Sequence, residues 1–251
     1  MSLQVLVSGA TGAVGRTIIE VIESDDRFTL AGEATSAQFF EPDVQADVIV
    51  DFSHPDLLEH VARFAARRRI PLVTGTTALG AALKDELREI AREIAICQAA
   101  NFSVGVNLLV RLADQAARAL GEDFDIEILE AHHRRKLDAP SGTALLLGET
   151  VAAARGQELA ERAVYDRSGR RQSRPAGEIG FQAIRGGDVA GEHTVYFLAD
   201  GERLELSHRS SDRRVFARGA LLAARRIIDR PTGLLDFSEL VFETSRTDKK
   251  V

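Results

Sequence analysis

Apolar and polar positions follow two different patterns along this chain, and the change divides it in two. In the first hundred residues, short apolar runs typical of buried parallel strands alternate with segments whose apolar residues recur at helical spacing. We expect strands at residues 3–7, 28–34, 47–52, 71–75 and 94–97, and helices at residues 17–22, 57–68 and 79–92. This alternation predicts an α/β fold with a Rossmann-like doubly wound parallel sheet, whose ligands bind at the carboxyl ends of the strands.

The pattern changes after a helix expected at residues 103–120. Residues 126–130 alternate apolar and acidic side chains, as a strand with one exposed face does. Beyond them we expect a helix at residues 141–155, strands at 179–184, 194–198 and 203–207 with the last two forming a hairpin, a helix at 215–228, and a polar, frayed tail at 245–251. The second part is therefore an α+β domain with an open mixed sheet.

We assign residues 1–103 and 213–251 to a dinucleotide-binding domain, and residues 104–212 to a substrate-binding domain. The first assignment rests on the segment Ser8–Arg16, which reads S-G-A-T-G-A-V-G-R between a strand and a helix. Gly9 permits the tight turn, Gly12 lets the backbone approach a pyrophosphate, and Gly15 allows the helix to pack closely.

Three groups of residues are expected to contact the dinucleotide. One group follows the first strand, one follows the second strand, and the third lies after the fourth and fifth strands. Small and hydroxyl side chains gather at these strand ends. The expected contacts are Gly9, Ala10, Thr11, Gly12, Ala13 and Val14; Thr35 and Ser36; and Gly75, Thr76, Thr77, Ala99, Ala100, Asn101 and Phe102.

Composition excludes several classes of protein. The 251 residues carry a net charge of −6, which argues against a nucleic-acid partner. Cys97 is the single cysteine, so no internal disulfide forms, and its apolar neighbours indicate a buried side chain rather than a nucleophile. The first strand begins at Leu3, and no apolar stretch is long enough to cross a bilayer. We expect a cytoplasmic protein without a signal peptide or a membrane partner.

Residues 130–144 carry the densest chemistry in the chain. The segment reads E-A-H-H-R-R-K-L-D-A-P-S-G-T-A, with two histidines and three cations before a helix that Ser141 can cap. Free amides at that helix start, together with the cations, suit a small anion that undergoes proton transfer. The alternative interpretation is a solvated basic loop in front of a capped helix.

This segment closely resembles the signature of the 4-hydroxy-tetrahydrodipicolinate reductase (dihydrodipicolinate reductase) family, E-x-H-H-x-x-K-x-D-A-P-S-G-T-A, which residues 130–144 match throughout. Residues 75–77, 100–107 and 185–193 resemble further family segments in the expected order. The resemblance implies reduction of a small cyclic dicarboxylate by NADH or NADPH, with loss of water, in the diaminopimelate and L-lysine pathway. It also implies that residues 104–212 are the oligomerisation domain as well, with a homotetramer formed through the second-domain sheets, and domain closure with hinges near Ser103 and Asp212.

By the same resemblance, His132 is the proton donor or acceptor and Lys136 the proton donor. His133 binds a substrate carboxylate, together with Ser141, Gly142 and Thr143 at the helix start. We expect no metal, because the histidines lack carboxylate or cysteine partners at ligand spacing. Arg134 and Arg135 are expected on a solvated or interface face, whereas Arg185 and His193 either shape the site or serve packing.

The coenzyme preference depends on the end of the second strand. Thr35 and Ser36 can hydrogen-bond a 2′-phosphate, and no acid at their positions repels it, so we expect NADPH to be preferred and NADH also to be used. Glu33 reaches the ribose instead if the strand ends earlier. No arginine follows Ser36 directly to hold the phosphate.

Two alternatives to a reductase stay open from the residues alone. A semialdehyde dehydrogenase shares a similar glycine loop but requires a nucleophilic cysteine, which Cys97 is poorly placed to provide. A non-catalytic NAD(P)H redox sensor would keep the glycine loop, yet it has no use for His132, His133 and Lys136 together.

Overall fold

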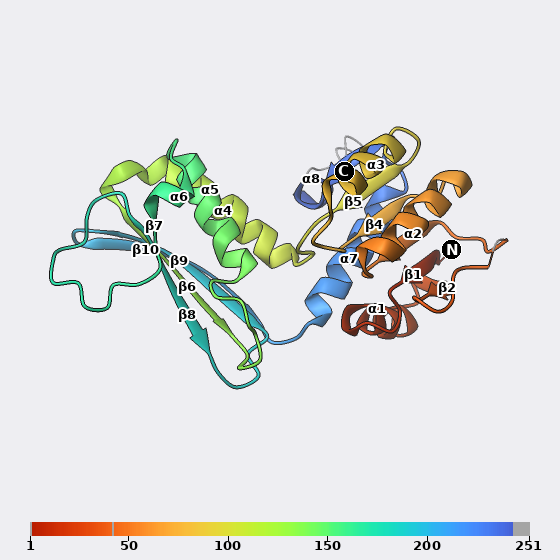
Figure 1. Ribbon diagram of the computed structural model, residues 1–251, viewed down its shortest axis with the longest axis horizontal. Helices are drawn as coiled ribbons and strands as arrows, with labels where there is room; N and C mark the ends of the chain where they lie inside the picture. Colours follow the sequence, from red (N-terminus) through yellow and green to blue (C-terminus); the bar gives the residue numbers. More distant parts are fainter. Residues whose placement is uncertain (1, 42, 243–251) are drawn as a thin grey trace, which may run out of the picture. The chain divides into compact units, whose positions relative to one another are not determined.

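The computed structural model describes residues 2–41 and 43–242, and it divides into two compact units (Figure 1). One unit comprises Met1–Val104 with Arg213–Val251, and the other comprises Gly105–Asp212. The first unit contains two hydrophobic clusters and the second unit contains one.

A parallel six-stranded sheet forms the centre of the first unit. The strands are β1 Leu3–Ser8, β2 Phe28–Ala34, β3 Val48–Asp51, β4 Leu72–Thr74, β5 Ala95–Gln98 and β11 Gly233–Asp236, in the order β11-β5-β4-β3-β1-β2. The order reverses at β1, which pairs with β3 on one side and with β2 on the other. A ligand site is expected at this switch point, outside the carboxyl ends of the strands.

Helices cover both faces of this sheet, which explains its continuous apolar strands. Val5, Val7, Val48 and Val50 pack with α1 Ala13–Glu23, α7 Arg214–Ile227 and α8 Phe237–Phe242. On the other face, Leu6 and Ile49 pack with α2 Pro55–Arg68 and α3 Ala81–Ile90. The predicted doubly wound architecture is confirmed.

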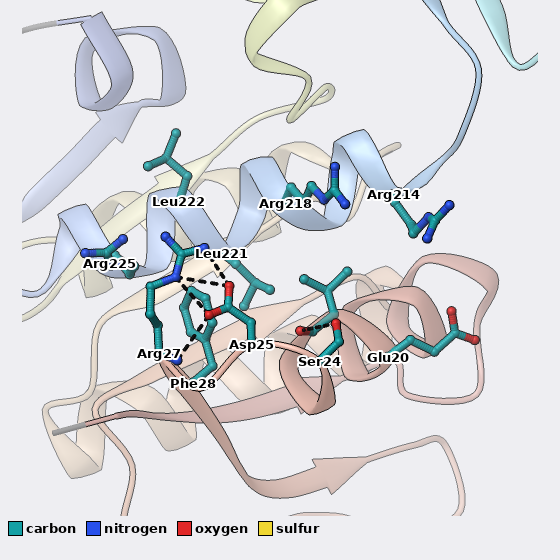
Figure 2. A pocket seen from close by; sticks show the side chains of 11 residues that line it. Glu20, Ser24, Asp25, Arg27, Phe28, Arg214, Arg218, Leu221, Leu222 and Arg225 are labelled. Atoms are coloured by element: carbon teal, nitrogen blue, oxygen red, sulfur yellow. Dashed lines mark hydrogen bonds and ion pairs between the residues drawn. The ribbon is translucent and has the colours of Figure 1, made fainter.

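A cavity of about 560 Å³ lies between α1 and α7, away from the carboxyl ends of the strands. Figure 2 shows Arg27 paired with Asp25 at one wall, while Arg218 and Arg225 extend from α7. The arginines of α7 are exposed to solvent, and none of the residues predicted to bind dinucleotide or substrate lines this cavity.

The second unit contains a five-stranded mixed sheet. Its elements are α4 Val104–Leu120, a 3₁₀ turn at Gly121–Asp123, β6 Asp125–His132, α5 Gly142–Ala154, α6 Leu159–Arg162, β7 Ala163–Val164, β8 Ile179–Arg185, β9 Gly191–Ala199 and β10 Glu202–Ser210. The strand order is β10-β9-β6-β8-β7, with β6 parallel to β8 and antiparallel to β9. The predicted hairpin is formed by β9 and β10.

Helices cover one face of this sheet, while on the other face Arg167 and Arg174 contact Glu127 and Ile184 is exposed. Ile126 and Ile128 alternate along β6 with the half-buried Glu127 and Leu129 and pack against α4 and α5, with Phe181 and Val195 from the adjoining strands. Figure 1 shows α4 and α5 on the same side of the strands. The strand expected at residues 126–130 is therefore confirmed, but Glu130, expected on the exposed face, lies on the buried face at 1% exposure.

Some elements were not predicted. The strand β11 and the short helix α8 follow α7 and add an edge to the first sheet beside β5. Four residues of alternating burial give too short a pattern to identify such a strand from the sequence. The tail expected at residues 245–251 lies outside the described residues. Within the described part of the chain, no helix is long and apolar enough to span a membrane.

Candidate active site

The loop between β1 and α1 has the geometry that its glycines predict. Gly9 has a φ of +78°, a conformation that favours glycine. A Cβ at Gly15 would lie 2.1 Å from the carbonyl oxygen of Gly9, so only glycine lets the helix start this close to the turn. Gly12 occupies the N-cap position of α1 and supplies no side-chain cap, so the first helical amides remain available to an anion. These features fit a bound dinucleotide pyrophosphate.

The same loop is attached to the end of β2. The amides of Gly9 and Ala10 both donate to the carbonyl of Ala34, at 2.9 and 3.2 Å. Thr35 follows directly, and its Oγ1 accepts hydrogen bonds from the amides of Ala37 and Gln38. The residues predicted to select the coenzyme therefore lie beside the phosphate loop.

A buried carboxylate organises the ends of β3 and β4. Asp51 is fully buried and accepts hydrogen bonds from the hydroxyls of Ser53, Thr74 and Thr76 at 2.5, 2.9 and 2.6 Å. Thr76 Oγ1 also accepts the amide of Ser53. The Thr76 side chain thus supports the loop, and Thr77, which is exposed, is the hydroxyl of this segment that faces solvent.

Aromatic packing sets the shape of the neighbouring segment. A Cβ at Gly75 would lie 2.2 Å from the ring of Phe52, which accounts for the glycine there. Phe52 packs against Phe102, and Phe102 in turn packs against Phe237. Phe102, predicted to contact the cofactor, is only 1% exposed and belongs to the core of the first unit.

In the second unit, strand β6 places Glu130 and His132 on one face of the sheet. Their spacing of two residues directs both side chains the same way. Glu130 is 1% exposed, and its Oε2 lies 2.6 Å from Nδ1 of His132. Arg185 on β8 donates to both carboxylate oxygens, at 2.7 and 2.6 Å. The result is a cluster of three ionisable side chains around a buried carboxylate, with His132 and Arg185 part-buried.

Ser141 caps α5 as expected, and its polar atoms are all engaged. Its Oγ accepts the amide of Ala144 at 3.2 Å and lies 3.0 Å from Nε2 of His193. Its own amide donates to Oε1 of Glu130 at 3.1 Å. Because the side chain is buried, we assign Ser141 to positioning the helix start, where Gly142 is exposed and Thr143 is half-buried.

The loop between β6 and α5 carries Lys136. Its Nζ pairs with Asp138 at 2.8 Å, and the Asp138 side chain is 58% exposed. Arg185 donates to the carbonyl of Asp138, so the loop is anchored to the Glu130 cluster. Arg134 and Arg135 are exposed, in agreement with a solvated or interface face.

Two shifted pKa values describe the electrostatics of this cluster. Burial disfavours the charged form of Glu130, but hydrogen bonds from Arg185 and His132 outweigh it and hold the pKa of that carboxyl below its usual range. Burial, with the nearby charge of His132, lowers the pKa of His193 to about 4. Glu130 is therefore ionised and His193 neutral at pH 7.

The structure brings His132, Ser141 and His193 together with two residues that the sequence analysis did not assign to the site. Arg185 had only a general shaping role, and Glu130 had no role at all. The E-x-H spacing was the signal available, but the strand was expected to end at Glu130, whereas β6 continues to His132 and so places both side chains on one face. Identifying Arg185 as the partner required the register of β6 with β8, in which His132 lies opposite Arg185.

The chain is similar to known proteins over nearly its full length. Two models of dihydrodipicolinate reductase match it, the N-terminus at residues 3–102 and the C-terminus at residues 105–241. The chain is 44% identical over 264 residues to a 4-hydroxy-tetrahydrodipicolinate reductase of Nitrosospira multiformis, covering 96% of this chain and 98% of that protein. The chain belongs to the dihydrodipicolinate reductase family. A second relative with the same name, from Halorhodospira halophila, is 43% identical over 265 residues, covering 96% and 99%.

A solved structure agrees with the fold. Dipicolinate-bound dihydrodipicolinate reductase from a Paenisporosarcina species aligns with a TM-score of 0.77 at 20% identity, covering 94% of this chain and 98% of that one. The family is one of dinucleotide-dependent oxidoreductases, and the comparisons give no support to the redox-sensor alternative. The semialdehyde dehydrogenase alternative also loses its nucleophile, because Cys97 is fully buried and burial raises the pKa of its thiol.

Proposed function

We propose that this chain reduces 4-hydroxy-tetrahydrodipicolinate to tetrahydrodipicolinate with NAD(P)H and loss of water, in diaminopimelate and lysine biosynthesis. One observation supports this most directly: a single segment, from β6 to the start of α5, carries a carboxylate-paired histidine, a half-buried lysine and a helix N-terminus. The unit of Met1–Val104 with Arg213–Val251 holds the dinucleotide, and Gly105–Asp212 binds the substrate and forms the oligomer.

The residues divide the chemistry among them. The dinucleotide, which the loop of Gly9, Gly12 and Gly15 would hold, would supply hydride for the unsaturated ring left after loss of the 4-hydroxyl group. His132 accepts or donates the proton that moves with that group, and Lys136 protonates the ring carbon next to the one that receives hydride. The ion pair of Lys136 with exposed Asp138 is weak, so the ammonium can exchange Asp138 for a substrate carboxylate.

The substrate carboxylates have two sets of donors. The amides of Gly142 and Thr143 lie at the N-terminus of α5, where the helix dipole favours an anion, and the Thr143 hydroxyl adds a donor. His133 and Lys136 supply the cationic side of the site. The buried hydroxyl of Ser141 holds this helix start in position.

A coupled assay tests the reaction. The preceding synthase generates the substrate in place from pyruvate and aspartate semialdehyde, and oxidation of NADPH or NADH is followed by absorbance. We expect turnover that depends on the synthase. Intact dinucleotide binding without turnover would contradict the proposal and favour the redox sensor.

We further propose that NADPH is preferred over NADH. A cavity of about 580 Å³ adjoins Thr35 and Ser36 and is lined across from them by His60, Arg63 and Arg67 of α2. Among the residues that the structure describes, no carboxylate lines this cavity, and Glu33 is not part of its walls. Arg63 already pairs with Glu59 and Glu86, so Arg67 and His60 are the groups best able to attract a 2′-phosphate.

Binding of 2′,5′-ADP and of 5′-AMP tests this preference without turnover. Titration calorimetry on the wild type is expected to show tighter binding of 2′,5′-ADP. Arg67→Ala should reduce that advantage, whereas Arg92→Ala, on the turn after α3, should leave it unchanged. Equal affinities of the wild type for the two nucleotides would overturn the NADPH proposal.

We also propose a homotetramer assembled through the second sheet. The face opposite α4 and α5 exposes apolar side chains, including Ile184 at 53%, which shares that face with Ala131 and lies next to Gln182 and Leu129. Exposed apolar area of this kind marks an interaction surface. Light scattering is expected to give four times the chain mass, and Ile184→Lys a smaller species; a monomeric wild type would refute the proposal.

A further inference from the structure

We propose that Glu130, held by Arg185, is a positioning residue for proton transfer: it keeps a proton on Nδ1 of His132 and leaves Nε2 as the reacting atom. This inference rests on the proposed reductase function, in which His132 moves a proton. It assigns roles to two side chains that contact no reacting atom.

The hydrogen bonds of Glu130 determine its charge state. Its two oxygens receive two guanidinium N–H groups of Arg185 and the amide of Ser141, all of them donors. A carboxylate surrounded by donors is ionised and can only accept. The group 2.6 Å from its Oε2, Nδ1 of His132, must therefore be the donor.

The tautomer of His132 follows from that pairing. A neutral imidazole with its proton on Nδ1 has its lone pair on Nε2, which can accept a proton; the imidazolium can donate the same proton back from Nε2. Both directions of proton transfer therefore use one nitrogen, while the other is held by the carboxylate.

Gly191 leaves room around that nitrogen. It is the first residue of β9, and a Cβ there would lie 3.2 Å from Nε2 and 3.5 Å from Cδ2 of His132. Any larger residue would press on the imidazole edge that the proposal assigns to catalysis. The space needed beside Nε2 of His132 therefore explains why position 191 is glycine, independently of the role of Glu130.

The same carboxylate links the rest of the site. Glu130 holds the amide of Ser141, where α5 begins, and Arg185 holds the carbonyl of Asp138 in the loop that carries Lys136. The ion pair of Glu130 with Arg185 therefore holds three parts of the site: His132, the start of α5, and the loop that carries Lys136. Arg185 is opposite His132 in the register of β6 and β8, so sheet pairing sets the geometry.

A matched control lies on the same strand. Glu127 is also part-buried and paired with two arginines, Arg167 at 2.9 Å and Arg174 at 3.1 Å, but it has no contact with His132. Glu130→Gln and Glu127→Gln therefore both remove a carboxylate charge from β6 beside arginine. Only the first removes the partner of His132.

Steady-state kinetics in the coupled assay is the first measurement. We expect E130Q to lower kcat by about 10- to 100-fold with little change in KM, which is the size of effect known for the carboxylates that orient metal-bound histidines. E127Q should leave kcat close to that of the wild type. Equal values of kcat for E130Q and E127Q would overturn the proposal, whereas an inactive wild type would instead refute the proposed function.

The pH profile distinguishes positioning from folding. The charged or titratable groups around His132 are Glu130 on its own strand, Arg185 on β8 and His193 on β9, and Lys136 and His208 act in turn on His193. E130Q removes the negative charge and replaces one acceptor oxygen by an NH2 donor, so the limb of the kcat profile governed by His132 should move to lower pH. An unmoved limb would contradict the proposal.

Nitrogen-15 NMR of histidine-labelled protein reads the tautomer without turnover. The wild type and E127Q should show His132 protonated at Nδ1 in its neutral form, and E130Q a mixture of both tautomers. Gly191→Ala should keep the Nδ1 tautomer yet lower kcat. If neutral His132 of the wild type is instead protonated at Nε2, the inference is refuted. This result does not depend on how well the variants fold, because it is measured on the wild type alone.

Discussion

The two units build their candidate sites from different materials. In the first unit, the phosphate loop offers backbone amides at the start of α1, and its shape depends on Gly9 and Gly15. In the second unit, the site depends on charged side chains, with Glu130 receiving hydrogen bonds from Arg185, His132 and Ser141. A backbone site is sensitive to added atoms, whereas a side-chain site is sensitive to removed charge and to pH.

This difference fits the two tasks. A pyrophosphate needs several amide donors but no proton transfer, so neutral backbone suffices. Reduction with loss of water requires protons to move, and that requires ionisable groups held at set positions. Three substitutions test whether the two sites respond as differently as their construction implies.

The largest effect is expected from Lys136→Ala. Removing the proposed proton donor should lower kcat by about 10²- to 10⁴-fold. Dinucleotide affinity, measured by fluorescence titration, should be unchanged, because the phosphate loop belongs to the other unit. Arg135→Ala, which removes an exposed cation one residue earlier, is the control. Full activity in K136A would show that the site assignment is wrong.

Gly15→Ala should produce the opposite pattern. The added Cβ would lie 2.1 Å from a backbone oxygen that cannot rotate away, so the loop must distort. We expect a loss of about 2–3 kcal/mol in the free energy of unfolding, measured with urea, and weaker dinucleotide binding. Gly80→Ala, at the N-cap of α3 with no atom within 4 Å, should change stability by about 1 kcal/mol or less. Similar results for both variants would argue against steric control of the loop.

The smallest effect concerns pH. The folded-state pKa of His193, about 4, lies below its ordinary value of 6.5, so the unfolded chain takes up a proton first as the pH falls. Stability contributed by neutral His193 is therefore complete above pH 6.5 and is lost on acidification toward pH 4. Between pH 7 and pH 4.5, wild type should lose about 2 kcal/mol more than His193→Gln in urea unfolding. Parallel losses would show that His193 is not buried as a neutral group.

Prediction from the sequence succeeded where the information is local. The strand at residues 28–34 matches β2 at both ends, and Ser141 caps α5 as its position before an apolar helix suggested. The glycines at 9 and 15 have the conformations and close contacts expected of them. In each case, residues close together in the chain determine the local conformation.

Prediction was weaker where residues distant in sequence meet. Phe102 looked like a cofactor contact because it follows a strand end, but packing with Phe52 and Phe237 buries it. Thr76 looked like a ligand for the same reason, yet its hydroxyl is bonded to Asp51. The sequence cannot show which of several polar side chains at a strand end turns inward.

The amino-acid sequence by itself determined the α/β class, the position of the phosphate loop, the 130–144 segment and the family resemblance, because these depend on periodicity and on residues adjacent in the chain. Only the tertiary structure decided that Glu130 holds His132, that Arg185 completes the cluster, and that His193 is buried beside Ser141. Those contacts join residues up to 55 positions apart in the chain. They depend on the register of β6 with β8 and β9, which is set by packing across the whole sheet and not by any local sequence pattern.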